Sequence, residues 1–89
     1  MIIKGYKEVD YFRLITLLRE YKSYNKKSNA QIAVELGFRS SQTIVNAFSY
    51  TEQNVKDSNF SKIMQYFGFD GIIIWHNRTK KYFIKNTIK

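Results

Sequence analysis

The sequence predicts a single, mainly α-helical domain with four helices and a C-terminal β-hairpin. Apolar residues recur at helical spacing between about residues 10 and 70, and capping or stop residues flank each such stretch. After residue 71 the pattern changes to consecutive β-branched and aromatic residues, which favour strands. The 89 residues contain no proline and only four glycines, so no interior linker is evident. We therefore predict one domain over 1–89, with a helical part over 10–70 and a hairpin over 71–86.

The first helix follows Asp10, whose side chain can cap it, and runs to about Tyr24. Leu14, Leu17 and Leu18 recur there at helical spacing, and the basic segment 22–27 ends the helix. Before this helix, residues 1–8 are compatible with either a short strand or a loose arm.

Two short helices come next. Ser28 with a glutamine three residues later forms a capping box for a helix over 29–36, and Gly37 is a C-terminal stop. Ser40 can cap a third helix over about 41–49, in which Ile44, Ala47 and Phe48 share one face. We expect the residues on that face to pack in the core.

A polar connection over 49–56 leads to the fourth helix. Asp57 or Ser58 can cap it, and Gly68 ends it. Its apolar residues fall at positions i, i+3, i+4 and i+7, which predicts one buried face; they are Phe60, Ile63, Met64 and Phe67.

The tail predicts a hairpin, with strands over 71–76 and 81–85 and a turn over 77–80. The first strand is apolar on both faces, and such a strand is usually covered on both sides. We therefore expect one side of the hairpin to contact a second subunit, through Ile72, Ile73, Ile74, Trp75, Tyr82, Phe83 and Ile84.

Composition excludes several classes of protein. Without cysteine there is no disulfide framework or thiolate metal site, and His76, the single histidine, has no nearby partner for a metal site or a catalytic dyad. No glycine-rich phosphate loop or nucleophile elbow appears. We expect neither an enzyme, nor a cofactor, nor a small-molecule substrate. No apolar run approaches the ~18 residues of a membrane span, which favours a soluble, cytoplasmic protein with no membrane partner.

Fifteen Lys and Arg residues against seven Asp and Glu give a net charge of +8, which favours a polyanionic partner. Ala33 and Gly37, four residues apart, indicate a helix-turn-helix, a motif that needs a small residue where its helices cross and a turn residue tolerant of positive φ. The second helix of that motif enters the DNA major groove. Its outward residues are then candidates to contact bases: Ser41, Gln42, Thr43 and Asn46. Cations that flank the motif are suited to phosphates: Lys26, Lys27 and Arg39.

Residues 10–70 resemble the phage-repressor and Cro-like helix-turn-helix family, also called the xenobiotic-response-element family. The matching residues are Gln31-Ile32-Ala33, Gly37-Phe38, Ile44, and Phe60, Ile63 and Phe67-Gly68-Phe69. The resemblance implies a four- to five-helix repressor-like domain that binds operators as a dimer, with the base-contacting positions named above. It also implies phosphate contacts from Ser28, Asn29, Gln31, Ser49, Tyr50, Thr51 and Asn54. The chain departs from the family in two ways: one extra residue lies between Gly37 and Ile44, and a hairpin replaces the usual last helix or linker.

The predicted function is sequence-specific binding of double-stranded DNA by a homodimer, as a transcriptional repressor or regulator of phage or mobile-element type. Three alternatives remain: an antitoxin that binds a toxin and its operator, a protein-interaction module that does not read DNA, and a single-strand binder that uses the aromatic, basic hairpin. Five cations without an acid among them form a second DNA contact or protect strand edges from aggregation; they are Arg78, Lys80, Lys81, Lys85 and Lys89.

Overall fold

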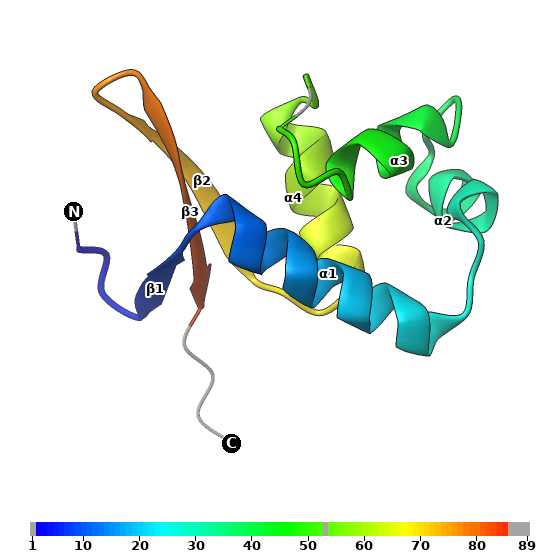
Figure 1. The fold of residues 1–89 in the computed structure, drawn as a ribbon, viewed down its shortest axis with the longest axis horizontal. Coiled ribbons are helices and arrows are strands. Elements are labelled where there is room, and N and C mark those ends of the chain that lie inside the picture. Colours follow the sequence, from blue (N-terminus) through cyan, green and yellow to red (C-terminus); the bar gives the residue numbers. More distant parts are fainter. Residues whose placement is uncertain (1, 53, 86–89) are drawn as a thin grey trace.

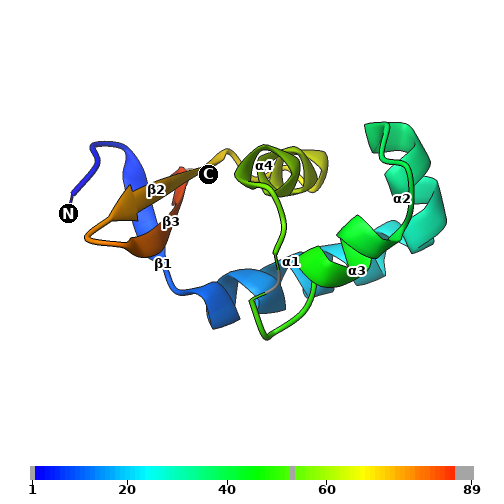
Figure 2. The ribbon, with the colours of Figure 1, turned by 90° about the horizontal axis from the view of Figure 1, so that it is seen from above.

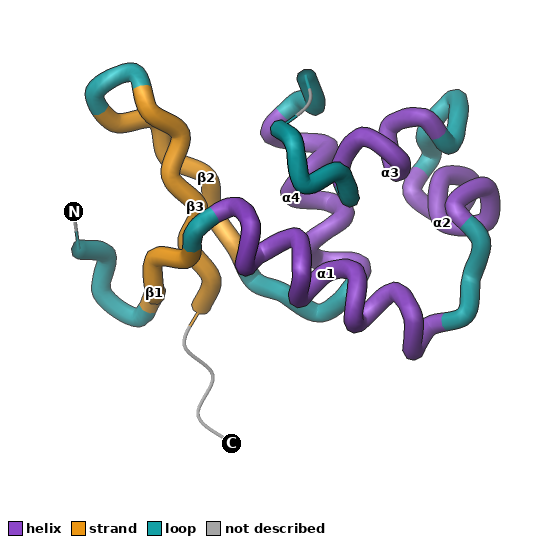
Figure 3. The backbone as a smooth tube through the Cα atoms, viewed as in Figure 1, coloured by secondary structure: helices purple, strands orange, loops and turns teal. Residues whose placement is uncertain are grey.

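The computed structural model describes residues 2–52 and 54–85, and within them the chain forms four helices and one three-stranded antiparallel sheet (Figures 1 and 3). The elements in chain order are β1 (Tyr6–Val9), α1 (Tyr11–Asn25), α2 (Asn29–Leu36), α3 (Gln42–Ala47), α4 (Asp57–Tyr66), β2 (Gly71–His76) and β3 (Thr79–Lys85). The sheet lies at one end of the molecule and α2 and α3 at the other, with α1 and α4 between them (Figure 1). No helix in the described part of the chain has the length and apolarity that a membrane crossing requires.

Helices α1 and α2 begin and end close to where local signals place them. The side chain of Asp10 accepts a hydrogen bond from the backbone N–H of Arg13 and so caps α1. Ser28 and Gln31 form the predicted capping box at the start of α2. Gly37 follows α2 with a φ of 77°, a left-handed conformation that glycine adopts without steric cost. The predictions of both helices are confirmed.

Helix α3 is shorter than predicted, because it spans only Gln42–Ala47. The Ser40 hydroxyl accepts a hydrogen bond from the backbone N–H of Gln42, although Ser41, and not Ser40, occupies the N-cap position. Ile44 and Ala47 are fully buried and Phe48 nearly so, which confirms the predicted inward face. Ser49 lies outside the helix.

The four predicted apolar residues are buried, three in α4 and Phe67 at its C-cap, but the start of the helix differs from the prediction. Lys56 occupies the N-cap position, so the expectation that Asp57 or Ser58 caps the helix is wrong. Asp57 is the first helical residue, and its carboxylate instead accepts a hydrogen bond from Trp75 Nε1 at 3.0 Å and pairs with Lys80 at 3.1 Å. The Asp57 side chain, which the local pattern assigned to capping, is thus engaged in a tertiary contact with the hairpin.

The hairpin is confirmed, with a tighter turn than predicted and a third strand beside it. Only Asn77 and Arg78 separate β2 from β3, whereas the sequence predicted a turn over 77–80. The sequence left residues 1–8 open between a short strand and a loose arm. Residues 6–9 form the strand β1. The order β1-β3-β2 places β3 in the centre and leaves β2 at an edge. Pairing runs from His76↔Thr79 at the turn to Gly71↔Ile84 at the other end.

All four helices lie on one side of the sheet (Figure 2). Alternation along β3 places Tyr82 on this inner face and Phe83 on the outer one. Tyr82 belongs to the main core and is 4% exposed, while Phe83 is 1% exposed. Both side chains are therefore buried by their own chain, and the prediction that they contact a second subunit is wrong. The sequence could not separate them because both are aromatic neighbours in one strand.

Candidate nucleic-acid interface

The outward face of α3 carries Gln42, Val45 and Asn46. Because Ile44, Ala47 and Phe48 point into the core, Gln42 and Asn46, which lie about half a helical turn away from them, face outward, with Val45 beside them. Gln42 Nε2 donates a hydrogen bond to Asn46 Oδ1 at 2.9 Å. The structure thus brings two of the four predicted base-contacting residues together as a linked amide pair.

The other two predicted residues lie to the side. Ser41 lies at the N-cap of α3 and Thr43 on the flank that faces α4; both are half-buried, as Asn46 is. Val45 is 47% exposed and was missed by the sequence reasoning. Its position three residues after Gln42, on the same side of the helix, was the signal that could have identified it.

A hollow lies on one flank of α3, where α1, α2 and α3 meet. It is lined by Arg19, Lys22, Ser23, Asn29, Val45 and Phe48. Arg19 Nε donates to the carbonyl oxygen of Phe48 at 2.8 Å, and Lys22 Nζ lies 5.9 Å from the centroid of the Phe48 ring. Asn29 Oδ1 is buried and has no hydrogen-bond partner among the described residues. Of these residues only Asn29 was predicted, because the sequence gave no reason to bring α1 to this place.

A second hollow lies on the opposite flank, between α3 and the start of α4. It is lined by Thr43, Asn46, Asn54, Val55, Lys56 and Asn59. Asn54 was predicted as a phosphate contact from the resemblance, and Lys56 and Asn59 were not predicted. Helix α3 therefore stands as a ridge between two hollows, and each hollow contains at least one cation and one amide side chain.

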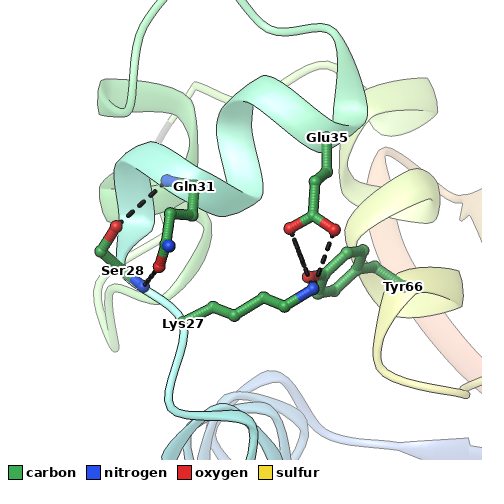
Figure 4. Close-up of polar contacts among 5 residues, drawn as sticks. All are labelled: Lys27, Ser28, Gln31, Glu35 and Tyr66. Atoms are coloured by element: carbon green, nitrogen blue, oxygen red, sulfur yellow. Dashed lines mark hydrogen bonds and ion pairs between the residues drawn. The ribbon is translucent and has the colours of Figure 1, made fainter.

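At the start of α2, most of the predicted phosphate contacts are engaged within the protein (Figure 4). The side chains of Ser28 and Gln31 cap the helix. Lys27 Nζ lies 2.8 and 3.1 Å from the carboxylate oxygens of Glu35, and the Tyr66 hydroxyl donates to the same carboxylate at 3.0 Å. These hydrogen bonds lower the pKa of Glu35, and the bond to Glu35 raises the pKa of Lys27. The charge of Lys27 is thus compensated within the chain.

The segment after α3 is tied to α1. The Tyr11 hydroxyl donates to the carbonyl oxygen of Ser49 at 2.7 Å, and the Tyr50 ring stacks on Phe12 at a centroid distance of 4.7 Å. The guanidinium of Arg19 lies 4.5 Å from the centroid of the Tyr50 ring. The backbone N–H of Thr51 donates to Ser49 Oγ. Three predicted phosphate contacts, at positions 49–51, therefore lie in a braced segment next to the first hollow.

The charges of the chain are unevenly distributed. Residues 21–51 contain four cations and a single acid, Glu35, which is paired with Lys27. The other three cations are exposed or half-buried and have no ion pair among the described residues; they are Lys22, Lys26 and Arg39. Positive potential therefore collects around the two short helices.

The predicted subunit contact is split between the two faces of the sheet. Ile73 and Ile84 pack against the core from the inner face, and so lie inside the chain's own packing. Ile72 and Ile74 lie on the outer face, half-buried, where no helix covers the sheet. Trp75 is 61% exposed and is held by its hydrogen bond to Asp57.

A scan against protein-family models, a search of curated proteins and a search of solved structures each found no match for this chain.

Proposed function

We propose that this protein binds double-stranded DNA sequence-specifically through α3, as a transcriptional regulator that resembles the phage-repressor type. The observation that carries the proposal is the position of α3, which presents Gln42, Val45 and Asn46 between two hollows that contain cations. A helix in the major groove meets base edges in front and a phosphate strand on either side.

The amide pair is suited to adenine. Gln42 Nε2 is engaged with Asn46 Oδ1, so Gln42 Oε1 and Asn46 Nδ2 stay available as one acceptor and one donor. Adenine presents the complementary pattern in the major groove, a donor at N6 and an acceptor at N7. Val45 lies beside the pair and is suited to the methyl group of thymine. Together they favour a site rich in A·T pairs under α3.

Phosphates of the two strands would be contacted from the two hollows. Lys22 and Asn29 would reach one strand, and Lys56 and Asn54 the other. A water bridging the buried Asn29 Oδ1 to a phosphate would also satisfy that acceptor, as ordered waters do in protein–DNA interfaces. Lys26 and Arg39 are free for the same role, whereas Lys27 must first leave Glu35.

We propose that the active species is a homodimer, held by the outer face and free edge of β2. This edge strand, Gly71–His76, contains no lysine and no proline, two devices that usually protect edges from pairing. Ile72 and Ile74 supply half-buried apolar surface on the outer face, which no helix covers. Two copies related by a two-fold axis would place two α3 helices on a pseudo-palindromic site.

Selection of binding sites from random duplexes tests the proposal. The wild-type chain should enrich one sequence family, and the double variant Gln42→Ala/Asn46→Ala should lose that preference while it keeps much of its affinity for random duplex. Gln65→Ala removes an exposed amide on α4, outside both hollows, and should leave the preference intact. Enrichment of the same sequences by the double variant would overturn the assignment of α3. Absence of duplex binding by the wild-type chain would overturn the function itself.

A further inference from the structure

The cations of the hairpin fall into two groups. Lys80 pairs with Asp57 at 3.1 Å, Lys81 with Glu8 at 3.5 Å, and Lys85 lies 3.9 Å from Asp70. Lys89, the last member of the predicted set, lies outside the described residues. Arg78 is exposed at the turn and has neither an ion pair nor a hydrogen bond from its side chain within the described ranges. The lysines of β3 are therefore paired within the fold, and the charge of Arg78 is left for solvent or a ligand.

Arg78 also occupies a position that its backbone disfavours. The two-residue turn holds Asn77 at φ 50° and Arg78 at φ 62°, which is the pattern of a type I′ turn. Glycine is strongly preferred at the second position, because a Cβ in the left-handed region is sterically costly. Position 78 thus carries a long cationic side chain although the conformation of the turn favours glycine there. Residues held in such conformations are often found at functional sites.

The hairpin is fixed to the segment that follows α3. Trp75 Nε1 donates to Asp57 Oδ2 at 3.0 Å, and Lys80 Nζ lies 5.2 Å from the centroid of the Trp75 ring. The Tyr82 hydroxyl donates to Glu52 at 2.6 Å. Glu52 lies in the connection between α3 and α4, and Asp57 is the first residue of α4. The turn of the hairpin and this connection reach toward the same edge of the molecule as α3, the upper edge in Figure 1.

We propose that Arg78 is a second DNA contact, which binds a phosphate of the backbone beside the stretch that α3 covers. This inference rests on the proposed function. The planar guanidinium can donate two parallel hydrogen bonds to one phosphate, and a rigid turn positions it at little entropic cost. The hydrogen bonds from Trp75 to Asp57 and from Tyr82 to Glu52 hold the turn at a fixed position relative to α3. Arg78 and α3 can therefore contact the same duplex.

The variant Arg78→Gly distinguishes a DNA contact from a structural role. If Arg78 contacts DNA, the variant should bind duplex more weakly without losing stability, whereas a structural role predicts a loss of stability. Glycine suits the left-handed turn, so the melting temperature should rise or stay unchanged. Loss of the phosphate contact should weaken binding to a random-sequence duplex about tenfold at low salt. It should also reduce the slope of log K against log salt concentration by about one unit. Arg78→Lys keeps the charge and should retain most of the slope.

The matched control is Lys4→Ala, which removes one exposed cation with no ion pair among the described residues, before β1 at the end of the sheet away from the turn. It should leave the salt slope within half a unit of the wild-type value. If the wild-type chain binds duplex and Arg78→Gly binds with the same slope, the contact at the turn is wrong while the proposed function stands. If the wild-type chain does not bind duplex at any salt concentration, both are wrong.

Discussion

At the helical end of the molecule, formed by α2, α3 and the second half of α1, one acid accompanies four cations between residues 21 and 51. At the sheet end, every lysine of β3 has an acidic partner within 4 Å. The sheet end nevertheless leaves Lys4, Lys7 and Arg78 without an ion pair among the described residues. The net charge of +8 is therefore divided between paired cations, which include every lysine of β3, and unpaired cations, which include most of those at the helical end.

The largest effect is expected from an acidic substitution in β2, and its outcome depends on the face of the sheet. Ile73→Asp places a carboxylate against the core, and we expect it to lower the free energy of unfolding by about 3 kcal/mol. Ile74→Glu lies on the outer face opposite Lys81, where the new acid can pair, so the fold should persist and the dimer should dissociate. Urea unfolding and sedimentation measure the two effects. A folded dimer of the Ile74→Glu variant would contradict the proposed subunit contact.

The second effect concerns the two sets of cations directly. Removing one free cation from each hollow, with Lys22→Ala/Lys56→Ala, should weaken binding to random duplex about a hundredfold and lower the salt slope by about two units. Removing two paired lysines, with Lys81→Ala/Lys85→Ala, changes the net charge equally. This control should alter the salt slope by less than one unit, because those charges are held by Glu8 and Asp70. Equal losses in both variants, measured by fluorescence anisotropy, would show that net charge alone drives binding.

The same comparison explains how far the sequence could predict the structure. The capping box of α2, the stop at Gly37 and the inward face of α4 depend on residues a few positions apart, and all three predictions are confirmed. Which cations are free depends on contacts between residues far apart in sequence, such as Lys81 with Glu8. No local pattern contains that information.

The candidate site divides along the same line. Gln42 and Asn46 could be predicted because one helical turn brings them together. Arg19 and Lys22 could not, because they reach Asn29 only when α1 packs across the start of α2. Asp57 shows a conflict between the two levels, since it fits a helix cap locally but pairs with the hairpin in the folded chain. The sequence analysis therefore identified the outward residues of α3, whereas the hollows on its two sides form only through tertiary packing.

The smallest effect is expected at Lys27, the one cation of the helical end that is paired like those of the sheet. Glu35→Gln removes its partner, so Lys27 becomes free beside the start of α2. We expect duplex affinity to rise slightly, by about twofold, and the salt slope to steepen by less than one unit. The stability should respond in the opposite direction and only where Glu35 is charged. Because hydrogen bonds to Lys27 and Tyr66 lower the pKa of Glu35, its contribution to stability is present above the pKa of the unfolded chain, about 4.3.

That contribution is lost as the pH falls through the lower pKa of the folded state. The raised pKa of Lys27 reports the same bond from its other side, so this stabilisation is also lost in strong alkali, where Lys27 gives up its proton. Thermal unfolding of wild type and Glu35→Gln between pH 3 and 7 should therefore give curves that differ at neutral pH and converge in acid. If the unfolding curves of wild type and Glu35→Gln stay parallel down to pH 3, Glu35 does not hold Lys27. Lys27 then already belongs to the unpaired cations of the helical end. In that case Glu35→Gln would leave the duplex affinity unchanged, and Lys27→Ala would weaken it.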